Sequence, residues 1–409
     1  MRADRDEAAV GGRVLTAGDG ARPRTSWTPL TGPAHEIALE VLLDGPLPRS
    51  ELARRLDLSP GSLTRLSKPL IDSGLLREIG SAQDPVSGRP TRPLDVDEDA
   101  HHFVGVKLTG DTAHGVLTTL RAHVVAHRDT VLPEASPAAV VDAVVHLVQS
   151  LRDDLREAVP DPDRGVRAVG VSLGGKVDAD GTVASARYLG WQDVPLGRLL
   201  EDALGLPVVV DNDVLSLTRA EQWFGTAARC DHFAVVVVGT GVGYGLVVHD
   251  EVVDRPDAGV GLLGHFPLDP NGPLCPEGHA GCADAVLPRA AVEARASVAL
   301  RRPVSFEEVL ELAGAGQPLA RRVVDDSARA LGTLVAAIAN TTMPKKVVLS
   351  GEGVRLAEVG RDALWDGITR HRSVHASPLD VDVQVTGFAE WARGAAITAV
   401  RTFVLGQRR

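Results

Sequence analysis

The stretch FVGVKLTGDTAHGVLTTL, residues 103–120, sets the expected architecture of the chain. Its two apolar runs predict two strands, and Gly110 with Asp111 predicts a tight turn between them. A glycine turn at the start of an α/β domain often cradles a phosphate group. Here Lys107 stands in the first strand and the turn has a single glycine rather than a pair. The residues alone leave open whether this turn holds a nucleotide.

The same pattern returns at Phe233–His249, which again predicts strand, Gly/Thr turn and strand. Val-rich strands between helices are typical of sheets that are covered on both faces, so two similar halves predict a duplicated α/β fold with a cleft between them. The expected strands are VVAHRDTVL (124–132), VRAVGVSL (166–173), LPVVVDND (206–213), HFAVVVVGTGVGYGLVVHDEVV (232–253) and KKVVLSG (345–351). The expected helices are Pro137–Ala158, Leu196–Leu204, Val214–Trp223, Val286–Leu300, Phe306–Ala313, Leu319–Thr342, Val354–His371 and Trp391–Leu405.

The composition narrows the class of protein. The chain has 409 residues, 44% of them hydrophobic, a formal net charge of −11 and 3 cysteines. A chain this acidic is not a general polyanion binder, so any contact with nucleic acid must be local. Three cysteines are too few for a disulfide framework, and no apolar run resembles a signal peptide or reaches the roughly 20 residues of a membrane span. We therefore expect a cytoplasmic protein without a membrane partner.

The N-terminal part predicts a small DNA-binding unit. Residues 1–31 lack periodicity and predict a disordered tail. Residues 32–98 contain three helical patterns, at 34–42, 50–56 and 60–71, with Ser59 as an N-cap for the third. The segments LLREIG and LDVD around a polar loop predict a strand–loop–strand wing. Three helices, a turn at 57–60 and a wing predict a winged helix-turn-helix.

The third helix of this unit is the candidate DNA reader, and the basic loop beside it suits the minor groove. A small helical module that binds protein is the alternative. The expected DNA contacts are Ser62, Thr64, Arg65 and Lys68 on the helix, with Arg89 and Arg92 in the wing.

Several motifs follow the winged helix in a fixed order: VRAVGVSLGGKVDADGTV, GLPVVVDNDV, VVVGTGVGYGLVV, LLGHFPLD and CPEGHAGCAD. Together they resemble the ROK family of repressors, open reading frames and sugar kinases, over residues 34–406. The resemblance implies an α/β body of two lobes at residues 99–409, with an actin-like (ribonuclease H-like) fold. ROK members with an N-terminal winged helix resemble sugar-responsive regulators of the xylose-repressor type.

The resemblance also bears on phosphotransfer. ROK kinases have an aspartate at the position of Lys107, followed by a Gly-Gly-Thr turn, and this aspartate helps to hold the Mg-nucleotide. The charge reversal removes the metal-holding carboxylate, which implies that the first phosphate site is lost and that the chain is not an enzyme. A lysine can itself bind phosphate, so a bound nucleotide with residual kinase activity is the alternative. The second turn, Gly239–Gly243, keeps its glycines and either approaches a phosphate or simply joins two strands.

The sugar site of the family maps onto DND at 211–213. The resemblance makes Asn212 a contact for sugar hydroxyls and Asp213 a vestigial general base, whereas an N-cap role for Asp213 is the structural alternative. The family's glutamate is Leu262 here, so the effector is either a different sugar or not a sugar. The expected ligand contacts are Gly174, Asn212, Asp213, His265 and Asp284.

The loop at about 265–284 contains the candidate metal ligands. Cys275, His279 and Cys282 form C-x3-H-x2-C, and His265 lies ten residues earlier. The family pattern and this spacing predict a structural Zn²⁺ site of four protein ligands, with Glu277 as the alternative fourth ligand. Two free thiols and a surface histidine are the alternative to a metal site.

The sequence thus predicts a DNA-binding transcriptional regulator, and more specifically a repressor. Its partners would be operator DNA, a carbohydrate-like effector and further copies of itself in a dimer or tetramer. A sugar kinase with a DNA-binding appendage is the second hypothesis, and a protein-interaction scaffold is the third.

Overall fold

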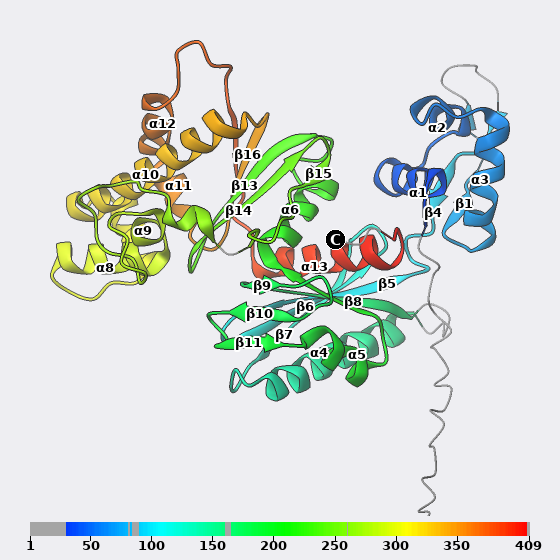
Figure 1. The fold of residues 1–409 in the computed structure, drawn as a ribbon, viewed down its shortest axis with the longest axis horizontal. Helices are drawn as coiled ribbons and strands as arrows, with labels where there is room; N and C mark the ends of the chain where they lie inside the picture. Colours follow the sequence, from blue (N-terminus) through cyan, green and yellow to red (C-terminus); the bar gives the residue numbers. More distant parts are fainter. Residues whose placement is uncertain (1–29, 81, 84–89, 160–164, 260, 407–409) are drawn as a thin grey trace, which may run out of the picture.

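The computed structural model describes residues 30–80, 82–83, 90–159, 165–259 and 261–406 (Figure 1). The predicted disordered tail therefore falls almost wholly outside the described residues, as does Arg89.

Three helices and small strand pairs form the first unit. Ser59 accepts a hydrogen bond from the N–H of Ser62 (3.1 Å), and Pro60 takes the first helical position, which together fix the start of the third helix. The elements are α1 (Pro33–Asp44), α2 (Arg49–Arg55), α3 (Pro60–Asp72), β1 (Leu76–Glu78) paired antiparallel with β4 (Leu94–Val96), and β2 (Ala82–Gln83) paired with β3 (Pro90–Thr91). The three helices and the β1–β4 pair lie where the sequence predicts helices and strands.

Two five-stranded sheets repeat one arrangement. In each, an antiparallel hairpin with a third antiparallel strand lies beside two parallel strands. The first sheet has the order β12 (Val208–Asn212), β8 (Val166–Leu173), β5 (His102–Leu108), β6 (Thr112–Thr119), β7 (Val124–Val131). The second has the order β17 (Asp380–Val383), β16 (Lys346–Ser350), β13 (His232–Val238), β14 (Val242–Val248), β15 (Glu251–Val252). The predicted duplication is confirmed, and residues 109–111 occupy the same place in the first sheet as residues 239–241 in the second.

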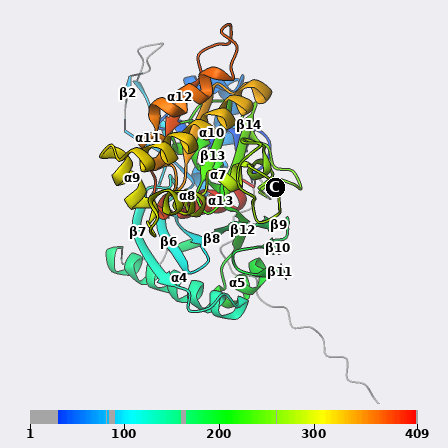
Figure 2. The ribbon, with the colours of Figure 1, turned by 90° about the vertical axis from the view of Figure 1, so that its left-hand side faces the viewer.

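Helices cover both sheets (Figures 1 and 2). The first lobe has α4 (Pro137–Ala158) and α5 (Leu196–Leu204) on one face, while α6 (Asp213–Phe224) and α13 (Phe388–Phe403) lie between the two sheets. The second lobe carries η1 (Leu262–His265), α7 (Ala283–Val286), α8 (Arg289–Leu300), α9 (Phe306–Gly314), α10 (Pro318–Thr342), α11 (Arg355–Val359) and α12 (Arg361–Arg370). None of the helices in the described ranges combines the length and the apolar character of a membrane span.

Two predicted helices are wrong in their continuity. The expected helix Val286–Leu300 begins only at Arg289 as α8, because its N-cap is Pro288, which cannot donate the backbone hydrogen bond of a continuous helix; Val286 instead ends the separate short helix α7. The expected helix Val354–His371 is split at Gly360 into α11 and α12. The sequence also missed a small third sheet, β9 (Lys176–Val177), β10 (Val183–Ala186) and β11 (Trp191–Val194), whose strands are too short for a clear pattern.

The helix α13 lies directly on the first sheet because two strand positions there are glycines. A Cβ on Gly105 would lie 1.9 Å from the carbonyl oxygen of Ala392, and a Cβ on Gly170 would lie 1.9 Å from that of Ala395. Only glycine therefore lets the helix backbone come this close to β5 and β8.

The N-terminal unit is packed onto the body rather than tethered loosely. Arg121, which follows β6, donates to the carbonyl oxygens of Val41 (2.9 Å) and Leu42 (3.0 Å) at the end of α1, and to Asp95 (2.7 Å). The ring of His35 lies 2.7 Å from the carbonyl oxygen of Leu405. A single apolar core runs from α1 into the C-terminal part of α13.

Gly170→Ala is expected to destabilise the chain by about 3 kcal/mol, because the added methyl group overlaps the backbone of α13. Urea unfolding followed by circular dichroism measures the change. Gly165→Ala, whose Cβ would meet nothing within 4 Å, is the control and is expected to be neutral. Equal stability of the two variants would contradict the close contact.

Candidate functional site: a polar cluster and a metal loop

A buried ion pair links the carboxyl end of β5 to the start of α6, which directly follows β12. The ammonium of Lys107 donates to Oδ2 of Asp213, and only 7% and 12% of the two side chains are exposed. The Lys107 Nζ also lies 5.2 Å from the ring centroid of Trp391 on α13, a cation–π contact. Lys107, which stands where the kinases of the resembled family have an aspartate, is thus bound by Asp213, which stands at the position of their general base.

The residues beside this pair are committed to the backbone. Asn212 caps α6 by accepting from the N–H groups of Val214 (2.9 Å) and Leu215 (3.2 Å), and its amide donates to Gly175 O (2.9 Å) and more weakly to Gly259 O (3.4 Å). The alternative of an N-cap role for Asp213 is therefore wrong, since Asp213 is the first helical residue. Only 3% of the predicted ligand contact Asn212 is exposed, and both its amide oxygen and its amide nitrogen already have hydrogen-bond partners in the backbone.

A chain of contacts joins the ion pair to the second lobe. A Cβ on Gly174 would lie 3.5 Å from Oδ2 of Asp213 and 4.0 Å from the Tyr188 ring. The hydroxyl of Tyr188 donates to the carbonyl oxygen of Thr240 in the second glycine turn (3.2 Å). No sequence motif pointed to Tyr188. The one available signal was its rarity, since the chain has only 2 tyrosines, and the structure places this one in an exposed loop.

Asp284 closes this chain on the side of the second lobe. Its Oδ1 accepts from the N–H of Val242 (2.9 Å), and a Cβ on Gly264 would lie 2.4 Å from its Oδ2, so the carboxyl is packed beneath η1. Burial raises the pKa of Asp284 above its ordinary value. Of the predicted ligand contacts, the structure thus brings Gly174, Asp213 and Asp284 into one polar cluster and places His265 on η1 beside it. Leu262 begins η1 with an exposed side chain.

The first glycine turn holds a carboxylate of its own. Oδ1 of Asp111 accepts from the hydroxyls of Thr109 (3.0 Å) and Thr112 (3.2 Å), and the N–H of Thr112 donates to Thr109 Oγ1 (3.0 Å). A fixed anion in this turn repels the phosphate group that a glycine turn could otherwise hold.

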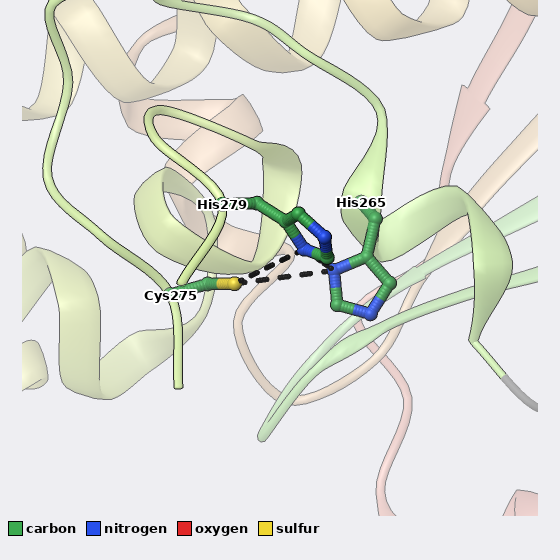
Figure 3. Close-up of side chains that lie close together, drawn as sticks. All are labelled: His265, Cys275 and His279. Atoms are coloured by element: carbon green, nitrogen blue, oxygen red, sulfur yellow. Dashed lines mark hydrogen bonds between the residues drawn. The ribbon is translucent and has the colours of Figure 1, made fainter. Parts of the chain in front are cut away.

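Three of the four predicted metal ligands lie together in the loop after η1 (Figure 3). The Nδ1 atoms of His265 and His279 are 3.1 Å apart, and Sγ of Cys275 lies 4.0 Å from the first and 3.6 Å from the second. A tetrahedral Zn²⁺ with bonds of about 2.1 Å to nitrogen and about 2.3 Å to sulfur separates its ligands by about 3.4 Å (N···N) and about 3.6 Å (N···S). The triangle therefore has the size of one face of such a tetrahedron.

The surroundings of Cys275 favour a thiolate. Burial alone would raise the pKa of its thiol, but hydrogen bonds from the N–H groups of His279 and Glu277 bring that pKa below its ordinary value. The thiol of Cys282 donates to the same sulfur, while burial raises its own pKa. Oε2 of Glu277 lies 3.2 Å from Nε2 of His265, the ring nitrogen that faces away from the triangle. Glu277 therefore orients the ring, as carboxylates do beside metal-bound histidines.

The residues predicted to read DNA lie on one face of α3. Thr64, Arg65 and Lys68 are exposed, and Ser62 is half-buried. Arg92 is exposed as well, 3.6 Å from Glu78. The opposite face of α3 is buried through Leu63, Ser67 and Leu70, so the polar face points outward.

Comparisons with solved structures define the class as two-lobed α/β proteins that include sugar kinases and regulators. The fold matches a ROK-family transcriptional regulator described as a homologue of the Escherichia coli Mlc protein, with a TM-score of 0.79, 23% identity and coverage of 91% of this chain and 96% of that chain. It also matches the ROK hexokinase from Thermus thermophilus, with a TM-score of 0.61, 29% identity and coverage of 72% of this chain and 97% of that chain.

The family model of the ROK family matches residues 103–398, and the chain belongs to this family. The DNA-binding transcriptional dual regulator NagC of Escherichia coli (strain K12) is 28% identical, covering 75% of this chain and 77% of that protein. The xylose repressor of Bacillus subtilis (strain 168) is 23% identical, covering 76% and 79%. These relatives favour a regulator over a kinase.

Lys107→Met is expected to lower the free energy of unfolding by about 3 kcal/mol, because Asp213 keeps a buried charge without its partner. Asp213→Asn is expected to cost a similar amount, and the double variant to recover most of the loss. Urea unfolding of the four proteins gives the coupling. Lys345→Met, which removes an exposed ammonium paired with Asp231, is the control, with a change below about 1 kcal/mol. Simple addition of the two losses would contradict the pairing.

Proposed function

We propose that the chain is a DNA-binding transcriptional repressor whose ROK body, residues 99–409, binds a carbohydrate-like effector and no longer transfers phosphate. The Lys107–Asp213 pair is the observation that carries the proposal. A general base must accept a proton from the hydroxyl that it activates, and Oδ2 of Asp213 is already occupied by an ammonium. The same lysine stands where the family's kinases have a carboxylate for the Mg-nucleotide.

The DNA-binding part of the proposal rests on residues 32–98, read as a winged helix-turn-helix. The exposed face of α3 offers Thr64, Arg65 and Lys68 to a groove, and Arg92 lies beside it on the wing. NagC is described as a DNA-binding regulator, and the xylose repressor is a repressor by name. A dimer or tetramer would present two such units to the half-sites of an operator.

The effector part rests on the polar cluster. Gly174, Asn212, Asp213, His265 and Asp284 remain the proposed contacts. Oδ1 of Asp213 accepts from the N–H of Val214 (2.9 Å) and Oδ1 of Asp284 from that of Val242 (2.9 Å), and the remaining lone pairs of both carboxylates are the proposed acceptors for hydroxyl groups. An effector alters DNA affinity only if it binds one arrangement of body and reader more tightly than the other.

The metal part of the proposal is a structural Zn²⁺ held by His265, Cys275, His279 and Cys282. Four protein ligands leave no open position, so the ion would fix the loop rather than catalyse. The fold of the loop then keeps His265 beside Asp284, where η1 meets the polar cluster.

Arg65→Ala is expected to weaken binding to a selected operator by about 1–3 kcal/mol, or roughly fivefold to 150-fold, if Arg65 contacts a base edge. Because the operator is unknown, duplexes are first selected from a random library and then titrated by fluorescence anisotropy. Arg322→Ala, which removes an exposed arginine from α10, is the control. The absence of any enriched sequence would contradict the proposal.

Cys275→Ser and His279→Ala are expected to release zinc and to lower Tm, because structural metal binding contributes directly to folding stability. Metal content by mass spectrometry and thermal unfolding with and without a chelator measure both effects. Cys230→Ser serves as the control, since Cys230 is half-buried against the core of the second sheet and is not part of the metal loop. Wild-type protein that contains far less than one zinc per chain after purification with added Zn²⁺ would contradict the site.

A further inference from the structure

The loop between β16 and α11 crosses the start of the second glycine turn. The N–H of Gly353 donates to the carbonyl oxygen of Val238 (2.8 Å), and Gly351 takes a φ of +102°, which favours glycine. A Cβ on Gly351 would also lie 2.4 Å from that same oxygen. The loop is therefore held against the end of β13, and Glu352 is carried between these two glycines.

The carboxylate of Glu352 fills the space beside Gly239. A Cβ on Gly239 would lie 2.7 Å from Oε2 of Glu352 and 2.8 Å from its Oε1. The glycine that could let a phosphate approach the turn is thus covered by a carboxylate. A phosphate and a carboxylate within a few ångströms of each other repel strongly in a partly buried site.

The space beyond Glu352 is also too small for a nucleoside. Glu352, Thr386, Gly387, Phe388 and Trp391 line a cavity of about 50 Å³, whereas pockets for ligands of this size have volumes of roughly 300–1,000 Å³. The Phe388 ring stacks on His114, with centroids 4.4 Å apart and planes at 21°, which ties the start of α13 to β6.

The two glycine turns of the duplicated fold are therefore blocked in the same way. Asp111 places a carboxylate in the first turn, and Glu352 places one against the second. Between them, the charge of Lys107 is neutralised by Asp213. The N–H of Arg289 donates to the carbonyl oxygen of Gly239 (3.2 Å), but its guanidinium lies over the Phe306 ring and 3.5 Å from Glu307, so its charge is already paired with another carboxylate.

We propose that Glu352, together with Asp111, excludes nucleotides from the ROK body. This inference rests on the proposed loss of phosphotransfer and deepens it. Glu352 acts as a specificity-determining residue, since it decides which class of ligand reaches the junction of the lobes. The ligand class follows from the charges: a polyphosphate meets two carboxylates, whereas hydroxyl groups meet acceptors.

The test is titration calorimetry with Mg²⁺ and a non-hydrolysable ATP analogue. Wild-type protein is expected to give no saturable binding at millimolar analogue. Glu352→Gln keeps the size and removes the charge, and Glu352→Gln with Asp111→Asn removes both charges. Saturable binding is expected to appear in the double variant, with a dissociation constant about tenfold to a hundredfold below the millimolar limit of the wild type. Glu358→Gln, which changes an exposed glutamate on α11, is the matched control.

Micromolar binding by the wild type would overturn the inference, as would unchanged binding in every Glu352 and Asp111 variant that keeps the wild-type Tm. Glu352→Gly adds space as well as removing charge. A gain in Glu352→Gly with none in the glutamine variants would overturn the electrostatic argument. The operator selection is independent of these titrations, so a regulator that also binds nucleotide would keep the proposed function and lose only this role for Glu352.

Discussion

The ion pair between Lys107 and Asp213 is the constraint on which the functional interpretation depends. Two charges that are almost excluded from water stabilise a fold only when each satisfies the other, so this pair cannot release one partner without a cost of several kcal/mol. It joins the ends of β5 and β12, two strands that are not neighbours in the sheet but are separated by β8. Because Oδ2 of Asp213 binds the ammonium, the main role of this carboxylate is structural, and only its Oδ1 remains to contact a ligand.

Because Lys107 also lies against Trp391, the pair is connected to α13. This helix has 16 residues and is therefore about 24 Å long. Its first turns contact the polar cluster, and its last turns, with Ile397 and Val400, belong to the apolar core shared with α1. Its middle is fixed on the first sheet at Gly105 and Gly170. The helix therefore connects the polar cluster physically to the N-terminal unit, and its close contacts with the sheet resist bending.

Local patterns predicted much of the fold, while contacts between distant segments escaped them. The bounds of α4 and α5 match the prediction because proline, capping residues and apolar spacing all lie within a few residues. Pro288 and Gly360 mark the starts of α8 and α12. The apolar spacing continues on both sides of these residues, so the pattern predicts one longer helix at each place. The pairing of Lys107 with Asp213 spans 106 residues, and Glu352 reaches Gly239 only through the arrangement of β13 beside β16. No spacing rule in one sequence reports such meetings. The metal loop could be predicted from the sequence because its candidate ligands lie close together in the chain.

The duplication explains why the loss of a phosphate site would involve both halves. In a symmetric pair of turns, one reversed charge leaves the other turn able to hold a phosphate, so Lys107 alone does not exclude a nucleotide. The proposed exclusion of nucleotides needs a carboxylate at each turn. The two carboxylates come from different sources: Asp111 belongs to the first turn itself, whereas Glu352 comes from the loop between β16 and α11. The second arrangement preserves the glycine backbone of 239–241, which explains why that turn looks intact in the sequence. Glycine leaves room for Glu352 beside residue 239 and for Tyr188 beside residue 241, where an added Cβ would lie 3.3 Å from the tyrosine hydroxyl. In this chain the turn is therefore better understood as a contact between lobes than as a phosphate loop.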